Sequence, residues 1–86
     1  MYRLVRKGDG RTHTSSKVCY VSFYVKTGMF RKKHRLPKIG RSLLMSPFSI
    51  YFTWMTTQIT EIIEEKEGYT HFKTLNSEYE LFKEQT

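Results

Sequence analysis

This sequence of 86 residues has one cysteine, no long apolar run and few acidic residues in its first half. The first two shortages limit which structural classes the protein can belong to. The single cysteine, Cys19, excludes an intramolecular disulfide framework and suits a reducing compartment. No apolar run approaches the roughly 18 residues of a membrane-spanning helix. The opening residues MYRLVRKGDG lack the apolar segment of a signal peptide. We therefore expect a cytoplasmic protein.

Metal-binding and catalytic motifs are also missing. The residues that could act as soft metal ligands are His13, His34, His71 and Cys19. None of them are paired at the C-x-x-C or H-x₃-H spacing of a zinc site. Nothing marks a nucleophile with its base, and the glutamates within 61–67 are more typical of a solvated face than of a catalytic pair. We expect no metal, no cofactor and no enzymatic activity.

The segment GDGRTHTSS (8–16) offers glycine N–H groups that could cradle an anion. It lacks the Lys-Ser/Thr pair and the following helix that a phosphate-binding P-loop requires. Its content of Gly, Asp, Ser and Thr predicts an ordinary hairpin turn instead.

Acidic residues are nearly absent from the first half of the chain. Residues 1–43 contain twelve Lys/Arg and one acidic residue, Asp9, whereas residues 44–86 contain three Lys/Arg and seven Glu. The net charge of +7 therefore combines a basic half with an acidic half. The basic half is the expected contact surface for an anion.

Alternating apolar and polar residues predict short strands at 2–6, 17–26, 41–46, 69–74 and 77–82. In the clearest of them, the face expected to meet the core carries Cys19, Val21, Phe23 and Val25. The opposite face, expected to be exposed or to meet a ligand, carries Val18, Tyr20, Ser22 and Tyr24.

The segment 49–68 is ambiguous. Ile59, Ile62 and Ile63 fit one face of a helix that Gly68 would end, whereas its many β-branched and aromatic residues favour a strand over 56–64. We favour the strand, with Ile62 at a bulge or on the second face.

With this strand, residues 56–83 form a three-stranded antiparallel meander whose last turn contains Asn76. Residues 1–86 are then one small, mainly β domain, an antiparallel barrel or rolled sheet of five to six short strands.

Aromatic residues gather just before the meander. Phe52 and Trp54 are expected to lie in the core, because so small a domain needs its large side chains there. Phe48 and Tyr51, beside Pro47, could be exposed, and in that case their apolar patch would favour self-association.

The stretch WMTTQITEIIEE, followed by FKTLNSEYEL, resembles short orphan proteins of bacteriophages and prophages that have an SH3-like small β-barrel. The resemblance covers residues 53–82 and rests on structural rather than chemical motifs. It implies a strand at 56–64, a viral or mobile-element origin and therefore the host cytoplasm, but it implies no particular activity.

The segment TGMFRKKHRLPKIGR (27–41) has no sustained period, and Pro37 disfavours a helix, so we predict a basic loop. Its cations can neutralise phosphates, and nearby aromatic rings can stack on bases. The candidate ligand-binding residues are Arg31, Lys32, Lys33, Arg35, Lys38, Arg41, Tyr20, Tyr24 and Phe30. The alternative is that the charge only keeps a small protein soluble.

Three functions fit these observations. The first is a non-enzymatic accessory protein of phage type that captures nucleic acid or a nucleotide messenger, as a means to counter host defence. The second is an inhibitor that docks its basic face on an acidic or nucleic-acid-binding groove of a host protein. The third is a small structural or regulatory subunit that self-associates head to tail, with the acidic half of one copy meeting the basic half of the next.

Overall fold

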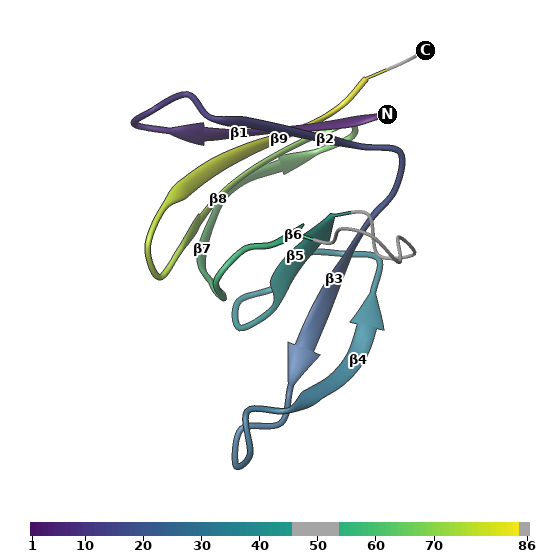
Figure 1. Cartoon of the computed structure of the whole chain (residues 1–86), viewed down its shortest axis with the longest axis vertical. Helices are drawn as coiled ribbons and strands as arrows, with labels where there is room; N and C mark the ends of the chain where they lie inside the picture. Colours follow the sequence, from purple (N-terminus) through teal and green to yellow (C-terminus); the bar gives the residue numbers. More distant parts are fainter. Residues whose placement is uncertain (46–53, 85–86) are drawn as a thin grey trace.

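The computed structural model describes residues 1–45 and 54–84, and these residues form β-strands and turns without a helix (Figure 1). The strands are β1 (Tyr2–Lys7), β2 (Thr12–Ser15), β3 (Val18–Phe23), β4 (Phe30–His34), β5 (Ser42–Met45), β6 (Trp54–Met55), β7 (Ile59–Lys66), β8 (Tyr69–Thr74) and β9 (Glu78–Lys83). The mainly β fold predicted from the sequence is confirmed, and the described residues are all-β. The positions of Phe48, Tyr51 and Phe52 lie outside the described residues.

The strands form two antiparallel sheets. The five-stranded sheet has the order β2-β1-β9-β8-β7, and the four-stranded sheet has the order β4-β3-β5-β6. No closed barrel is formed by the part of the chain that the structure describes, because each sheet keeps two edge strands. In the same residues, no helix has the length and apolar character needed to cross a membrane.

The segment 56–64, which had two interpretations, contributes to strand β7 rather than to a helix. The pairing of β7 with β8 has irregularities between Ile59 and Glu61 and between Ile62 and Glu64. A bulge inserts one extra residue, so side chains three positions apart can share a face. Ile59 is buried and Ile62 packs against the core, which explains why their spacing resembled that of a helix.

The predicted meander is present, since β7, β8 and β9 pair in antiparallel order. Its first turn contains Gly68, whose φ of 79° lies in the left-handed region that glycine adopts most easily. Its second turn is closed by Thr74, whose N–H donates to the carbonyl of Ser77 at 2.8 Å.

Two strands lie where the sequence predicted turn or loop, and β6 lies just before the strand predicted at 56–64. The predicted count of five to six strands was therefore too low. Strand β2 occupies part of 8–16 and pairs with β1. Strand β4 occupies the middle of the predicted basic loop 27–41 and pairs with β3. Four of its five residues are exposed. A strand exposed in this way carries no apolar alternation, which is the signal that sequence reasoning needs.

The core lies between the two sheets. Its buried members are Leu4, Tyr20, Leu43, Met45, Ile59, Phe72, Tyr79 and Leu81. Trp54 packs against this cluster, as expected, and meets the ring of Tyr79 edge-on with centroids 5.9 Å apart. The imidazole of His13 stacks on Trp54 at 4.2 Å and extends this packing to β2.

The predicted faces of β3 need correction. Tyr20, expected to be exposed, is 3% exposed and belongs to the core, whereas Val25, expected to be buried, is fully exposed. Val21 is buried too, so both faces of β3 are covered at its centre. Alternation cannot tell the inner face from the outer one when both are covered. Val25 lies beyond the end of the strand, in the hairpin turn.

Shortening a buried isoleucine should destabilise the protein, whereas shortening an exposed one in the same strand should not. Ile59→Val should lower the free energy of unfolding by about 0.5–1.5 kcal/mol, because it removes a core methyl group. Ile63→Val, at a position 43% exposed, is the matched control and should change it by less than about 0.5 kcal/mol. Urea unfolding measures both, and equal losses would contradict the assigned core.

Candidate functional site

Negative charge is confined to one of the two sheets, whereas positive charge occurs in both. Residues 10–60 contain no Asp or Glu, so all eight acidic residues belong to the five-stranded sheet, its turns or the residue after β9. Residues 16–58, which hold the four-stranded sheet and its loops, contain eight Lys/Arg. The five-stranded sheet and its turns contain the other seven. The basic region is therefore the four-stranded sheet and not the whole of residues 1–43.

The first cations of the chain lie among carboxylates. Arg3 pairs with Glu84, and the guanidinium of Arg6 lies 2.5 Å from Asp9. The hydrogen bond from Arg6 and the backbone N–H of Arg11 hold the pKa of Asp9 far below its usual range. Their charge is thus compensated within the five-stranded sheet.

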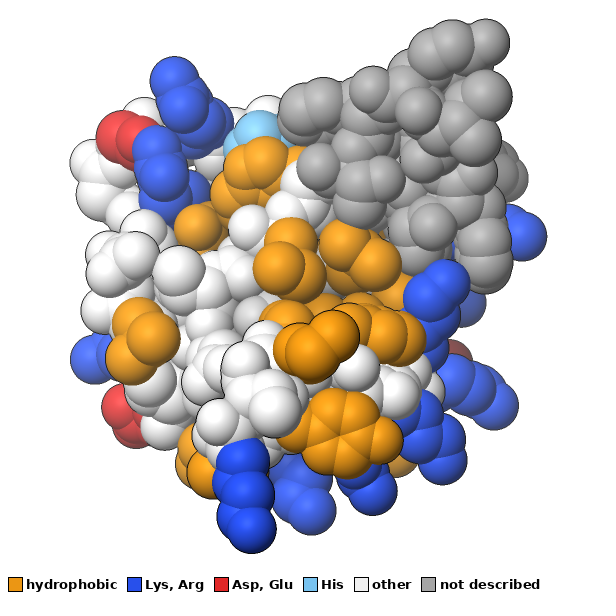
Figure 2. All heavy atoms as spheres, turned by 60° about the horizontal axis from the view of Figure 1, so that its bottom comes forward, with side chains coloured by type: hydrophobic (Ala, Val, Ile, Leu, Met, Phe, Trp, Pro, Cys, Tyr) orange, Lys and Arg blue, Asp and Glu red, His pale blue; other side chains and the backbone are white. Residues whose placement is uncertain are grey.

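A cleft of about 470 Å³ opens beside the β3–β4 hairpin. This hairpin lies at the bottom of Figure 1, the end that comes forward in Figure 2. It is lined by Ser22, Phe23, Tyr24, Val25, Gly28, Arg31, His34, Lys38, Ile39, Gly40, Arg41 and Gln58. Four of these, Tyr24, Arg31, Lys38 and Arg41, were candidates from the sequence. No carboxylate lines the cleft, and among residues 1–45 and 54–84 no ion pair involves its Lys or Arg side chains.

The hairpin fixes one wall of the cleft. Tyr24 closes the turn, since its N–H donates to Met29 at 2.9 Å and its carbonyl accepts from Gly28 at 2.8 Å. The pairing of β4 with β3 is irregular near Arg31, because Ser22 lies opposite Lys32 and the next residue lies opposite Phe30. The extra residue of a bulge re-aims its side chain. Arg31 thereby lines the same cleft as a residue three positions away, His34.

The loop before β5 fixes the other wall. Its Gly40 N–H donates to the carbonyl of Ile59 at 2.8 Å, and the N–H of Ile59 donates to the carbonyl of Arg41 at 2.7 Å. The Arg41 guanidinium donates to the carbonyl of Leu36 at 2.8 Å, and the backbone N–H of Arg41 donates to the carbonyl of Lys38 at 3.1 Å. The first two bonds hold the loop against the start of β7, and the other two lie within the loop itself.

The surroundings of His34 show that the cleft is electropositive. Its Nε2 lies 2.9 Å from the hydroxyl of Ser22. Its pKa is lowered, first by loss of water around the ring and then by the nearby charges of Arg41, Lys32, Arg31 and Lys38. Four cations thus act on one imidazole, so the local field favours a neutral ring. Sequence reasoning left His34 out of the site, although its place within the basic run was a usable signal.

Three of the predicted residues do not join the cleft. Tyr20 is buried in the core, so its ring cannot stack on a ligand. Lys33 lies opposite Val21 in the β3–β4 pairing and directly precedes His34 in strand β4. Because neighbouring residues of a strand point to opposite faces, Lys33 projects from the face of the sheet opposite to that of His34. Its charge acts on the thiol of Cys19, whose pKa is raised on balance by burial. Arg35 lines a different cavity.

Two further candidates flank the cleft without lining it. Lys32 lies opposite Ser22 and is near enough to affect His34. Phe30, at the start of β4, is 54% exposed. In Figure 2, Lys and Arg side chains crowd the lower and right-hand edges of an area of hydrophobic side chains. The cleft therefore has a basic and partly aromatic surround.

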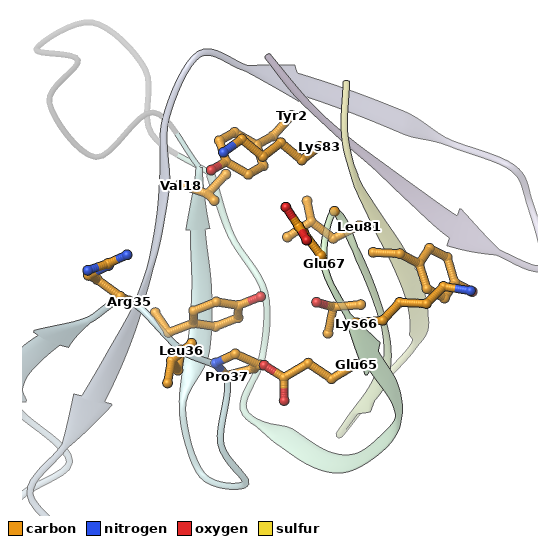
Figure 3. A pocket seen from close by; sticks show the side chains of 14 residues that line it. Tyr2, Val18, Arg35, Leu36, Pro37, Glu65, Lys66, Glu67, Leu81 and Lys83 are labelled. Carbon is orange, nitrogen blue, oxygen red and sulfur yellow. The ribbon is translucent and has the colours of Figure 1, made fainter. Parts of the chain in front are cut away.

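A second cavity, of about 420 Å³, lies between the two sheets (Figure 3). Arg35 and Pro37 lie on one wall, and Glu65 and Glu67 lie on the wall opposite. Burial raises the pKa of the Tyr20 hydroxyl beside it. Because this cavity carries both signs of charge, it suits a polyanion less well than the cleft does. In the described part of the chain, no group of three or more His, Cys, Asp or Glu is placed to hold a metal.

Comparison with models of known families, with curated proteins and with solved structures gave no match for this chain.

The lowered pKa of His34 should make the stability depend on pH. The unfolded chain binds this proton more readily than the folded protein does, so stability should fall as the pH drops from about 7 to 5. His34→Gln should flatten this dependence. His13, whose pKa is also lowered, stays in both proteins and contributes equally. Melting temperatures at the two pH values measure the effect, and an unchanged or steeper dependence in the variant would contradict it.

Proposed function

We propose that the protein is a non-enzymatic accessory binding protein of phage type that captures a phosphate-bearing ligand, a nucleic acid or a nucleotide messenger, to counter host defence. The observation that carries the proposal is the convergence of Arg31, Lys38 and Arg41 on one cleft without a carboxylate. Phosphate groups that bind such cations release counterions, which gives an affinity that depends on salt.

Exposed aromatic rings support the same ligand class. Tyr24 is 53% exposed at the cleft, and Phe30 is 54% exposed at the start of the adjacent strand. A base can stack on such a ring while its phosphate meets a neighbouring cation. Charge alone would be compatible with a solubilising role, whereas charge combined with exposed rings is typical of nucleotide recognition.

The two sheets also support an SH3-like rolled sheet, which we propose as the finer description of the fold. The hydrogen bonds between Ile59 and the Gly40–Arg41 segment join the start of β7 to the loop that leads into β5. The two sheets are therefore continuous at this point, as expected when one long sheet is rolled up.

Reversing two cleft charges should weaken binding of a fluorescent single-stranded oligonucleotide of about twelve nucleotides. We expect Arg31→Glu with Lys38→Glu to raise the Kd at least about tenfold, and to reduce its change between about 50 and 200 mM salt, because fewer phosphates are neutralised. Fluorescence anisotropy measures both quantities.

The matched control makes the same change of charge on the five-stranded sheet, with Lys66→Glu and Lys73→Glu. Its Kd should stay within about threefold of the original protein, because these lysines lie outside the cleft. Equal weakening in the two variants would mean that net charge alone attracts the oligonucleotide, and the cleft would lose its role.

Removing the ring of Tyr24 tests stacking separately from charge. Tyr24→Ala should weaken oligonucleotide binding by about 1–3 kcal/mol, while Tyr24→Phe keeps the ring and should bind normally. The unfolding free energy should change little in either variant, since this side chain is half exposed. Normal binding by the alanine variant would exclude stacking at this position.

The second candidate function is an inhibitor that docks on an acidic or nucleic-acid-binding groove of a host protein. Exposed apolar side chains beside the cleft favour it, since Val25, Met29 and Ile39 are each more than half exposed. Apolar contacts ringed by charge are usual at protein interfaces. A host protein that stays bound after nuclease treatment, with no binding of oligonucleotides or nucleotides, would favour this function over the first.

A further inference from the structure

Each sheet ends in a strand whose outer edge has no neighbouring strand among the described residues. Strand β4 is one edge of the four-stranded sheet, whose other edge is β6, and β7 is one edge of the five-stranded sheet, whose other edge is β2. An edge strand presents backbone N–H and C=O groups that a strand from another molecule can bond. The first residue of β7 is already engaged, because Ile59 bonds to Gly40 and Arg41. The residues from Thr60 to Lys66 continue beyond this contact.

The two edges carry opposite charge. In β4 the exposed side chains include Arg31, Lys32 and Lys33. In β7 they include Glu61, Glu64 and Glu65. Like charges directly opposite each other destabilise strand pairing, whereas opposite charges stabilise it. Either edge therefore repels a copy of itself and complements the other.

Each edge also exposes an apolar side chain. Phe30 of β4 is 54% exposed, and Ile63 of β7 is 43% exposed. Charged residues alone would be typical of edges that avoid all pairing. An exposed apolar side chain on each edge can be buried by a partner strand, which adds an apolar contact to the charge pairing.

We infer that β4 of one copy of this chain pairs with β7 of a second copy. An antiparallel register that places Arg31 opposite Glu65 also places Lys32 opposite Glu64, and it extends the sheets across the contact. The contact is heterologous, because it joins two different edges of identical molecules. Salt should weaken it, since both sets of charges are exposed.

Sedimentation velocity on the full chain without nucleic acid tests this contact. The average mass should rise with protein concentration at low salt and fall when salt is added. Arg31→Glu with Lys32→Glu makes both edges acidic, and Glu64→Lys with Glu65→Lys makes both edges basic. Each variant alone should stay monomeric.

The decisive measurement is an equimolar mixture of the two variants. Mixing places an acidic β4 beside a basic β7 and a basic β4 beside an acidic β7, so the mass should return to that of the original protein. A monomeric original protein at every concentration, self-assembly of either variant alone, or a mixture that stays monomeric would overturn the inference. Circular dichroism checks that each variant is folded. If a double variant does not fold, the single variant Lys32→Glu or Glu64→Lys takes its place in the experiment.

The test is separate from that of the cleft. The two glutamates of β7 are not part of the cleft, so the Glu64→Lys, Glu65→Lys variant can lose assembly while it retains oligonucleotide binding. Loss of both properties in this variant would instead point to a folding defect.

Discussion

The contact between Ile59 and the loop before β5 is the feature on which the rest of the structure depends. The backbone of Ile59 donates to Arg41 and accepts from Gly40, while its side chain is buried in the core between the sheets. One residue thus joins the two sheets, fills part of the core and holds the loop that carries Lys38.

The separation of charge follows from how the chain is divided between the sheets. Several carboxylates pair with cations of their own sheet, as Asp9 does with Arg6 and Glu84 with Arg3, and no carboxylate lines the cleft. The lowered pKa of His34 is the local consequence, because several cations act on one ring. The same division gives β4 a basic edge and β7 an acidic one. Ligand capture and self-association would therefore draw on one electrostatic arrangement and compete for β4.

Sequence patterns predicted much of the fold and part of the candidate site. Alternation placed β1, β3, β8 and β9, and β-branched residues indicated a strand where β7 lies. They also singled out the basic segment, from which Arg31, Lys38 and Arg41 line the cleft. Strands β2 and β4 were missed, because exposed strands have no apolar period and take their form from pairing with β1 and β3. The spacing of Ile59 and Ile62 allowed a helix as an alternative, because the extra residue of a bulge places side chains three positions apart on one face of a strand.

The sequence by itself determined the β class, the excess of positive charge and its concentration before residue 42, because composition and local pattern do not depend on folding. Only the tertiary structure decided which cations share a surface. Strand pairing sends Lys33 to the opposite face, leaves Arg35 at the cavity between the sheets and brings His34 into the cleft. It also buries Tyr20, which looked exposed. The physical reason is that strand register and sheet packing depend on contacts between residues far apart in the chain, which no local pattern contains.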